Sequence, residues 1–334
     1  MTDTMRTLRF HAYGEPADVL RLEEAAIPDP HPGQVRIRVA ACGLNPADWA
    51  LCRGLFAREL PRGIGLDVAG VISGVGEGVS GVEVGEAVLG PANYADHPTA
   101  GASDQAILDH WTAVPPGLGM AEAASLPMAV ETACRYLDWL GVAAGQTVLV
   151  NGAGAMIGFA AVQMARLRGA RVIATAGETF AERLRALGAV VIPHGEGLPA
   201  RIGEIAARSP EWAPDLVFDA APLNMIVDGP SVRAVLTELV EIARGDPKRV
   251  ITCADFAAAA AMGVRNGMGE TPGGPDGAVL RYDVLGQFAR LAAEGRFSVP
   301  VARTFPLEHW REAMNLSLRG HARGKLVLLT EAGV

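Results

Sequence analysis

The sequence predicts an α/β protein in which a doubly wound parallel sheet is joined to a second, β-rich domain. Three observations predict this class. Residues 147–177 have the pattern of a strand, a glycine turn, a helix and a second strand. Strand-like and helical segments then alternate from 182 to 252, which is typical of a parallel sheet with helices on both faces. Residues 65–90 hold short valine-rich segments divided by glycines, a pattern typical of a small, strongly bent β-barrel.

In the β-rich part, residues 35–39 alternate apolar and charged side chains, as a strand with one face in water does. Residues 40–56 are expected to form a loop that enters a short helix, because Asn45 and Pro46 together favour a turn. The other elements expected here are a strand at 5–13, strands within 65–90, a polar loop at 91–103 and a return to the sheet at 106–114.

The glycine turn follows the short apolar strand 147–150 directly. A helix N-terminus after such a turn favours a pyrophosphate, because its backbone N–H groups and its dipole attract negative charge. The spacing is irregular, since Ile157 stands where the usual GxGxxG pattern has its third glycine. The alternative is a tight turn that binds nothing. The residues expected at the pyrophosphate are Gly152, Gly154, Ala155, Met156, Ile157 and Gly158.

The remaining pattern places a dinucleotide-binding domain inside the β-rich one. The predicted boundaries give residues 1–127 with 276–334 to the β-rich domain and 128–275 to the inserted domain. Further elements expected are helices within 120–140 and at 182–187, 232–243, 282–294 and 307–318, strands at 190–192, 216–220, 249–252, 301–305 and 325–329, and a mobile glycine-rich lid or crossing segment at 262–277.

Composition limits the function classes. The net charge of −8 argues against nucleic acid or an anionic membrane as a partner. The spacing of the four cysteines suits neither a zinc site nor a disulfide framework. No apolar run approaches the ~20 residues of a membrane span, and the N-terminal residues lack an apolar signal core. We therefore expect a reduced, cytoplasmic protein.

Four segments resemble one known family. They are GQVRIRVAACGLNPADWALCRG, GIGLDVAGVISGVGEGV, SLPMAVETA followed by AAGQTVLVNGAG, and the closing RGKLVLL. Together they resemble the medium-chain dehydrogenase/reductase superfamily, in its zinc-free quinone oxidoreductase and enoyl reductase branch. The resemblance implies a GroES-like β-barrel catalytic domain, a Rossmann domain and a homodimer.

The resemblance also implies an enzyme without zinc. Zinc-dependent relatives have a cysteine in the position of Asn45 and a histidine in the position of Leu66, and neither residue here is a good zinc ligand. The relatives' structural-zinc loop with four cysteines is absent from the sequence. Without a Lewis acid for alcohol oxidation, a quinone or an α,β-unsaturated carbonyl becomes the expected substrate.

NADPH is predicted over NADH. NAD-binding proteins have an acidic residue at the end of the second strand, and the register gives Ala176 there. Ala176 and Gly177 leave room for a 2′-phosphate, and Arg183 is a candidate counter-ion, with a solvated helix residue as its alternative. Two residues argue the other way. Glu178 would repel a phosphate if it faced inward, and Phe180 stands where many NADPH-using relatives have lysine.

By resemblance, Asn45 reaches the ribose and amide region of the nicotinamide, with a role as turn former as the alternative. Asp48 either caps the following helix or holds Asn45 and the substrate loop. Asp67 resembles the aspartate of the family's G-x-D segment, and we expect it to be a buried structural acceptor rather than a catalytic base. Lys325, in the closing segment, is a further cofactor-binding candidate.

Thr132 matches a threonine that contacts the cofactor in relatives, or else it packs a helix. Cys253 and Ala254 follow the fifth strand and are expected near the nicotinamide, with Cys253 a packed residue because no His/Asp arrangement supports a nucleophile. The proton donor is open, because Phe56 stands in the position of the relatives' tyrosine. Tyr94 is the catalytic candidate, although exposure on the surface is its alternative; His97 or water are others.

The implied reaction is hydride transfer from the nicotinamide to the substrate, followed by protonation. Negative charge on the substrate oxygen must then meet backbone N–H groups, a cofactor hydroxyl or the Asn45 amide. Two alternatives stay open at this stage. One is a protein that binds NADPH in a structural or redox-sensing role with little turnover. The other is an enoyl reductase of a biosynthetic, polyketide-like pathway.

Overall fold

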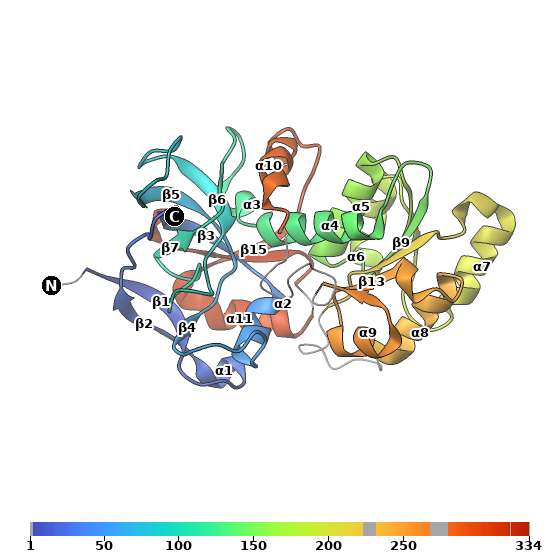
Figure 1. The fold of residues 1–334 in the computed structure, drawn as a ribbon, viewed down its shortest axis with the longest axis horizontal. Helices are drawn as coiled ribbons and strands as arrows, with labels where there is room; N and C mark the ends of the chain where they lie inside the picture. Colours follow the sequence, from blue (N-terminus) through green and yellow to red (C-terminus); the bar gives the residue numbers. More distant parts are fainter. Residues whose placement is uncertain (1–2, 223–231, 268–279, 321, 334) are drawn as a thin grey trace. The chain divides into compact units, whose positions relative to one another are not determined.

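The computed structural model describes residues 3–222, 232–267, 280–320 and 322–333, in two compact units (Figure 1). Unit 1 comprises Met1–Ala129 with Tyr282–Val334, and unit 2 comprises Val130–Arg281. The domain boundary predicted at 127/128 remains a prediction, and the one predicted at 275/276 lies outside the described residues.

Unit 1 is built on antiparallel β-structure. One sheet has the strand order β15-β16-β3-β5-β6-β8, in which only β15 and β16 pair in parallel, and β7 also pairs with β3. A smaller sheet has the order β2-β1-β4. The strands are β1 Thr4–Phe10, β2 Leu20–Ala26, β3 Val35–Leu44, β4 Arg62–Gly63, β5 Asp67–Val75, β6 Ala87–Pro91, β7 Gln105–Leu108, β8 Thr112–Ala113, β15 Val301–Pro306 and β16 Lys325–Leu329. The helices are α1 Pro16–Val19, α2 Pro46–Cys52, α3 Met120–Ala123, α10 Leu285–Ala293 and α11 Trp310–Leu318.

Strand β3 is longer than the sequence predicts. A loop was expected from residue 40, whereas the strand continues to Leu44. Residues 40–44 are buried on both faces, so they lack the alternation by which a strand is recognised. Pairing with β16 on one side and β5 on the other holds them extended. The strand therefore delivers Asn45 directly to the start of α2.

Unit 2 is a parallel sheet with the strand order β11-β10-β9-β12-β13-β14, as the predicted doubly wound class requires. The order reverses between β9 and β12, which are neighbours. The strands are β9 Thr147–Asn151, β10 Arg171–Thr175, β11 Val190–Ile192, β12 Leu216–Asp219, β13 Val250–Thr252 and β14 Arg265–Asn266. The helices are α4 Pro127–Leu140, which begins in unit 1, α5 Met156–Leu167, α6 Glu178–Ala186, α7 Leu198–Arg208, α8 Val232–Ile242 and α9 Phe256–Met262.

Helices cover both faces of this sheet (Figure 1). On one face, side chains of α7, α8 and α9 form a buried core with Leu149, Ile173 and Val217 of the sheet. On the other face, Tyr136 of α4 stacks on Phe218, with 5.3 Å between the ring centroids. The alternation of Val217 and Phe218 to opposite faces is the two-residue period of a strand.

Three elements of unit 2 differ from the predictions. Helices α7 and α9 were not predicted, and α6 begins at Glu178, whereas 182 was expected. The segment 262–277, predicted to be a mobile lid or a crossing segment, contains strand β14 at Arg265–Asn266, so this part of it belongs to the sheet. Its residues 268–277 lie outside the described residues.

The irregular glycine spacing has a steric reason. Gly152 has φ +74°, and a Cβ there would lie 2.7 Å from the backbone of Ala221. A Cβ at Gly158 would lie 2.4 Å from the carbonyl oxygen of Gly152 and 2.8 Å from Cα of Ala153. The first turn of α5 therefore packs closest against the turn backbone at position 158. This is why the third glycine of the pattern is needed at 158 and not at 157.

We predict that Gly158→Ala lowers the free energy of unfolding by about 1–3 kcal/mol, because the added methyl group meets fixed backbone atoms. Gly154→Ala is the matched control, since a Cβ at Gly154 meets only Phe180, at 3.6 Å. The control is expected to change stability by less than about 1 kcal/mol. Urea unfolding of both variants measures the difference, and equal effects would contradict this close packing.

Candidate active site

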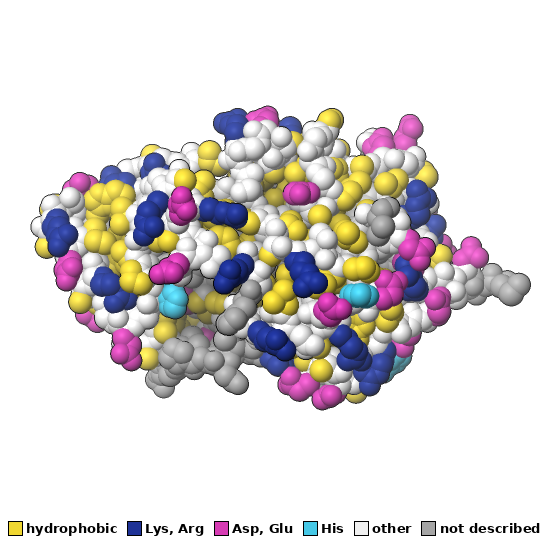
Figure 2. Space-filling model, turned by 180° about the vertical axis from the view of Figure 1, so that it is seen from behind, with side chains coloured by type: hydrophobic (Ala, Val, Ile, Leu, Met, Phe, Trp, Pro, Cys, Tyr) yellow, Lys and Arg dark blue, Asp and Glu magenta, His cyan; other side chains and the backbone are white. Residues whose placement is uncertain are grey.

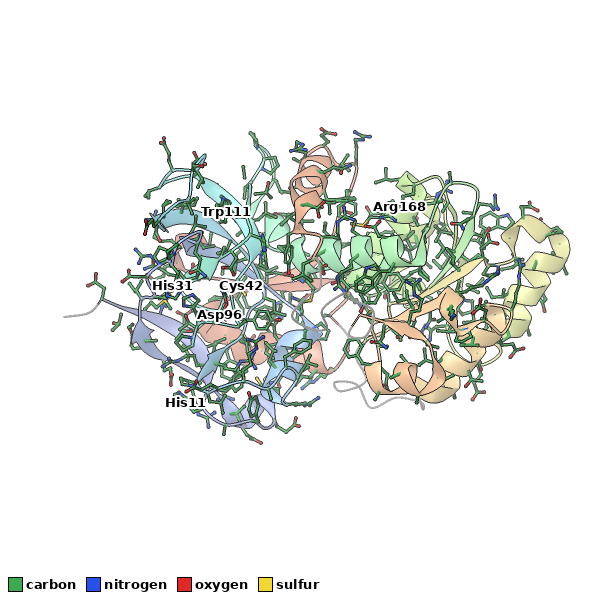
Figure 3. The ribbon with its side chains drawn as sticks, in the orientation of Figure 1. His11, His31, Cys42, Asp96, Trp111 and Arg168 are labelled. Atoms are coloured by element: carbon green, nitrogen blue, oxygen red, sulfur yellow. The ribbon has the colours of Figure 1, made fainter. Side chains whose placement is uncertain are left out.

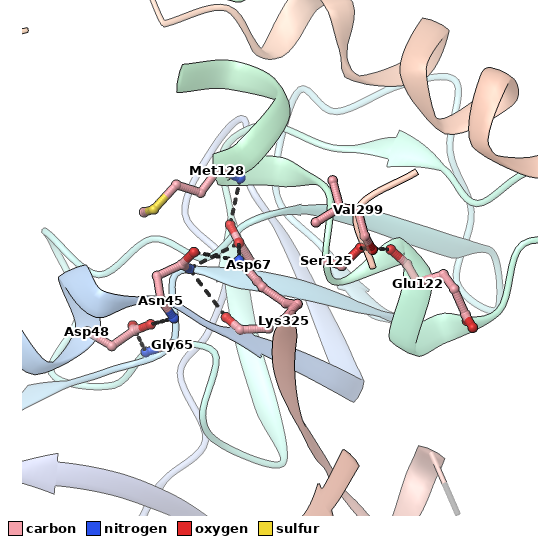
Figure 4. A network of polar contacts seen from close by, with 10 residues as sticks. Asn45, Asp48, Gly65, Asp67, Glu122, Ser125, Met128, Val299 and Lys325 are labelled. Atoms are coloured by element: carbon pink, nitrogen blue, oxygen red, sulfur yellow. Dashed lines mark hydrogen bonds and ion pairs between the residues drawn. The ribbon is translucent and has the colours of Figure 1, made fainter. Parts of the chain in front are cut away.

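Unit 1 contains a buried polar cluster of Asn45, Asp67 and Lys325 (Figure 4). The Lys325 ammonium lies 2.7 Å from Asp67 Oδ2 and 2.5 Å from Asn45 Oδ1. The Asn45 amide nitrogen donates to Asp67 Oδ2 over 3.1 Å. The backbone N–H of Met128 donates to Asp67 Oδ1 over 2.9 Å. Asp67 is 1% exposed and Lys325 3% exposed, so the cluster contains an ion pair removed from water.

Neighbouring strands bring these residues together. Lys325 begins β16, Asp67 begins β5, and Asn45 follows the last residue of β3, which pairs with both strands. Gly43 leaves space for the lysine stem, because a Cβ there would lie 2.8 Å from Lys325 Cε and 2.1 Å from the carbonyl oxygen of Ala124. The buried-acceptor role predicted for Asp67 matches these contacts.

Asn45 is fixed by its neighbours. Its side-chain oxygen accepts from Lys325, and its amide nitrogen donates to Asp67 and, over 3.4 Å, to the carbonyl oxygen of Gly43. Only 7% of Asn45 is exposed. It also precedes Pro46, the first residue of α2, so the turn role coexists with the cluster. Its contact with the nicotinamide stays a prediction.

Asp48 ties the start of α2 to the loop before β5. Its carboxylate accepts from the backbone N–H of Asn45 over 2.6 Å and from that of Gly65 over 2.7 Å. Both of the roles considered for Asp48, capping and holding the Asn45 segment, are therefore present in its contacts. Burial raises the pKa of Asp48 to about 7, although the two backbone hydrogen bonds oppose the rise.

The proton-donor candidates differ in exposure. Tyr94 is half-buried in the loop after β6, and Phe56 is exposed, with φ +50°. His97 is buried, and its ring centroid lies 5.2 Å from that of His31, which Figure 3 labels in unit 1. Burial, followed by the neighbouring His31, lowers the pKa of His97. His97 is thus no solvated loop histidine, and the catalytic role of Tyr94 stays a prediction.

In unit 2, a buried polar side chain ends each of four neighbouring parallel strands. Asn151 ends β9, Thr175 ends β10, Asp219 ends β12 and Thr252 ends β13. Asn151 Nδ2 donates to Asp219 Oδ1 over 2.9 Å, and the Thr175 hydroxyl donates to Asn151 Oδ1 over 2.7 Å. The sequence analysis missed this set, although a polar residue closing each apolar strand was a readable signal.

The start of α5 fits an anionic group. Ala155 is its N-cap and provides no side-chain cap, so the first-turn N–H groups of Met156, Ile157 and Gly158 have no partner from that side chain. Gly154 lies in the turn just before the cap. This arrangement suits the pyrophosphate of a dinucleotide.

The end of β10 leaves space for a 2′-phosphate. Ala176 is buried, and no atom lies within 4 Å of a Cβ built on Gly177, the N-cap of α6. Glu178 is exposed in the first turn of α6. Arg183 lies exposed in the last turn of α6. Its pairing with a phosphate stays a prediction.

Three further cofactor candidates are buried. Cys253 Sγ lies 3.5 Å from the carbonyl oxygen of Asp219, and burial raises the pKa of its thiol, which keeps it protonated and unreactive. Ala254 follows it, 3% exposed. The Thr132 hydroxyl is 3.3 Å from the Glu131 carboxylate. Cys253 and Ala254 lie next to the strand-end polar set.

The described residues contain neither a cluster of metal ligands nor a membrane-spanning helix. Across residues 3–222, 232–267, 280–320 and 322–333, no group of three or more His, Cys, Asp and Glu side chains is placed to hold a metal ion. Within the same described part of the chain, no helix is both long and apolar enough to cross a membrane.

Comparison with known proteins matches both halves of the chain. Residues 31–133 match the alcohol dehydrogenase GroES-like domain, and residues 211–328 match the zinc-binding dehydrogenase family. A solved structure of the quinone oxidoreductase from Coxiella burnetii superposes with a TM-score of 0.77 at 26% identity, covering 98% of this chain and 99% of that one. The chain belongs to the medium-chain dehydrogenase/reductase superfamily. Both the predicted resemblance and the predicted fold class are confirmed.

The curated relatives place this family member in its quinone oxidoreductase branch. The quinone oxidoreductase of Rattus norvegicus is 37% identical over 186 residues, which cover 54% of this chain and 55% of the relative. The spectinabilin polyketide synthase system protein NorB of Streptomyces orinoci is 38% identical over 178 residues, 53% of this chain and 8% of that protein. The chain thus spans about half of the rat enzyme and a small part of NorB.

We predict that Lys325→Met lowers the free energy of unfolding by about 3–5 kcal/mol, because Asp67 is left buried without its cation. Lys248→Met is the control, since Lys248, the other lysine of the chain, is exposed. The control should cost less than about 0.5 kcal/mol. Urea unfolding measures both, and similar small losses would show that the Lys325–Asp67 pair is not a buried ion pair in solution.

A second prediction concerns Asp48. Its pKa rises from 3.8 to about 7 in the fold, so the folded state holds a proton that the unfolded state releases between these pH values. The stability of the wild type relative to Asp48→Asn should therefore be highest near pH 4 and fall by about 2–4 kcal/mol as pH rises to 7. Thermal unfolding of both proteins across this range measures the difference. A difference that is flat, or that grows with pH, would contradict the raised pKa.

Proposed function

We propose that this chain is a zinc-independent, NADPH-dependent oxidoreductase that transfers hydride to a quinone or an α,β-unsaturated carbonyl. The observation that carries the proposal is the cluster of Asn45, Lys325 and Asp67. Asn45 occupies the position of a zinc-ligating cysteine in zinc-dependent relatives, and its side-chain oxygen is already bound by the Lys325 ammonium. Leu66, in the position of the histidine ligand, is a buried hydrocarbon. A cation held by this chain thus stands beside the residue where those relatives bind a metal.

The residues of unit 2 support the cofactor choice. The uncapped start of α5 and the glycines at 152 and 158 suit a pyrophosphate. The end of β10 has no acidic side chain to bind a ribose 2′-hydroxyl, and the space at Gly177 suits a 2′-phosphate. NADPH supplies a hydride when bound.

Asn45 is the proposed donor to the ligand. The hydrogen bond from its amide to the carbonyl oxygen of Gly43 is the longest in the cluster, at 3.4 Å. This N–H can therefore most easily change its partner and donate to an acceptor on a ligand. The Lys325 ammonium on the amide oxygen strengthens that donor by polarising the amide. Lys325 then acts through Asn45, as a positioning residue, and Asp67 keeps the ammonium in place.

A second candidate is the enoyl reductase of a polyketide-like pathway, which the similarity to the NorB segment favours. A carrier-bound substrate would need a basic docking surface for an acidic carrier. On the face that Figure 2 shows, the described Lys and Arg side chains are interspersed with Asp and Glu. Free small-molecule substrates are therefore preferred. A cytoplasmic location and a homodimer complete the proposal.

We predict that the purified protein oxidises NADPH in the presence of a quinone or an enone, with a lower KM for NADPH than for NADH, because β10 ends without an acidic side chain. A zinc chelator should leave the rate unchanged. Absorbance at the reduced-nicotinamide band, with a panel of free and carrier-bound substrates, measures this. Loss of activity with the chelator would contradict the metal-free mechanism. Tight NADPH binding without turnover would favour a binding or redox-sensing protein.

A further inference from the structure

Asp219 has no part in the function proposed above, yet its carboxylate is at the centre of the strand-end polar set. Its Oδ1 accepts from Asn151 Nδ2 over 2.9 Å, and its Oδ2 accepts from the Thr252 hydroxyl over 2.8 Å. Asp219 is 1% exposed. Among the residues that the structure describes, none forms an ion pair with it. Burying an acid without a cation is costly, so apolar side chains would hold these strands together at lower cost.

The hydrogen bonds continue from Asp219 to the glycine turn. Asn151 Oδ1 accepts from the Thr175 hydroxyl over 2.7 Å, and Thr175 Oγ1 accepts in turn from the backbone N–H of Gly152 over 2.9 Å. Gly152 is the residue whose φ of +74° shapes the turn before α5. Thr175 lies on β10, the strand next to β9. A side chain of a neighbouring strand therefore sets the orientation of the Gly152 peptide group.

In the other direction, the bonds reach the segment after β13. Thr252 Oγ1 accepts from the backbone N–H of Ala254 over 2.9 Å while its hydroxyl donates to Asp219. One carboxylate therefore fixes two backbone segments at the carboxyl edge of the sheet. This is the edge at which doubly wound proteins bind their ligands.

We propose that Asp219 is a positioning residue for dinucleotide binding, which holds the Gly152 turn and the Ala254 segment in one fixed relation. The inference rests on the proposed function, in which this edge binds NADPH. Asp219 acts through Asn151, Thr175 and Thr252, and its Oδ1 also accepts from the backbone N–H of Ala221 over 3.3 Å. Because the ligand then meets a turn that is already ordered, less of its binding free energy is spent on ordering the backbone.

The test compares NADPH affinity in three variants by fluorescence titration. Asp219→Asn places an amide where an acceptor is needed, so the Thr252 hydroxyl loses its acceptor, and the dissociation constant should rise about tenfold. The double variant Asn151→Asp/Asp219→Asn exchanges donor and acceptor and restores the bonds to Thr175 and Thr252, while the long 3.3 Å bond from the backbone N–H of Ala221 is lost. It should recover affinity to within about threefold of wild type.

Asp215→Asn is the matched control. Asp215 lies before the other end of β12, where its carboxylate accepts from the backbone N–H of Thr147 over 2.9 Å. It should lower stability without changing NADPH affinity. A merely structural role for Asp219 would make Asp219→Asn behave like Asp215→Asn, with lower stability and unchanged affinity.

The outcomes separate the inference from the function beneath it. NADPH binding by wild type with unchanged affinity in Asp219→Asn overturns the inference and leaves the proposed function standing. A wild type that does not bind NADPH overturns both. If Asp219→Asn does not fold, Thr252→Val breaks the same chain of bonds at its other end. Weaker NADPH binding by folded Thr252→Val supports the inference, and wild-type affinity overturns it.

Discussion

The buried contact between Lys325 and Asp67 is the constraint on which the site in unit 1 depends. A lysine and an aspartate removed from water must stay paired, since either one alone would be an uncompensated buried charge. Because the two residues begin β16 and β5, the strands on either side of β3, their pairing fixes the end of the sheet at which β3 finishes. Asn45 is then held by both partners. The chain has only two lysines among 29 basic residues, so a lysine at 325 is notable in a protein that otherwise uses arginine.

The choice of ammonium has a geometric reason. The position next to Gly43 admits a narrow stem and a compact charge with rotatable donors, which a lysine provides. A guanidinium is planar and broad, and its fixed fork suits a bidentate partner, whereas the acceptors here are one carboxylate oxygen and one amide oxygen. The cluster thus combines a buried ion pair with an orienting role for Asn45.

In unit 2, neutral polar side chains rather than an ion pair hold the backbone at the carboxyl edge of the sheet. The glycine turn proposed to bind the dinucleotide is made of backbone, which has no side chain to hold it in place. Thr175 and Asn151 hold it from inside the sheet, and Gly158 brings α5 against the turn. The same sheet is held by apolar packing on both faces, so the polar set is confined to the carboxyl edge. Stability and ligand binding are in this way assigned to different parts of the same strands.

The fold was largely predictable because its signals are local. The strand, glycine turn and helix of 147–167 each have a clear pattern, and the parallel class of the sheet follows from the alternation of strands and helices. Helix α7 was also readable, since Leu198, Ile202 and Ile205 recur at helical spacing, and Asp255 and Gly263 mark the two ends of α9. The extension of β3 was not, because residues 40–44 are extended only through pairing with distant strands.

The candidate site was predictable residue by residue but not as a set of contacts. Asn45, Asp48 and Lys325 were found through family motifs, yet the bond between Lys325 and Asn45 joins residues far apart in the chain. The start of α6 at Glu178, ahead of the predicted segment 182–187, was missed because its N-cap Gly177 provides no side-chain cap, which is the usual sequence signal for a helix start. Asp219 was read only as part of a strand.

The central claim is that this chain transfers hydride from a nicotinamide without a metal. Its most direct test is isotope transfer in protein stripped of metal, using NADPH that carries deuterium at both C4 positions and an enone as acceptor. Mass spectrometry of the reduced product gives the answer. The account predicts deuterium on the β-carbon of the product, in an amount matching the NADPH consumed. Transfer that appears only after zinc is added, or a reduced product without deuterium, would contradict it.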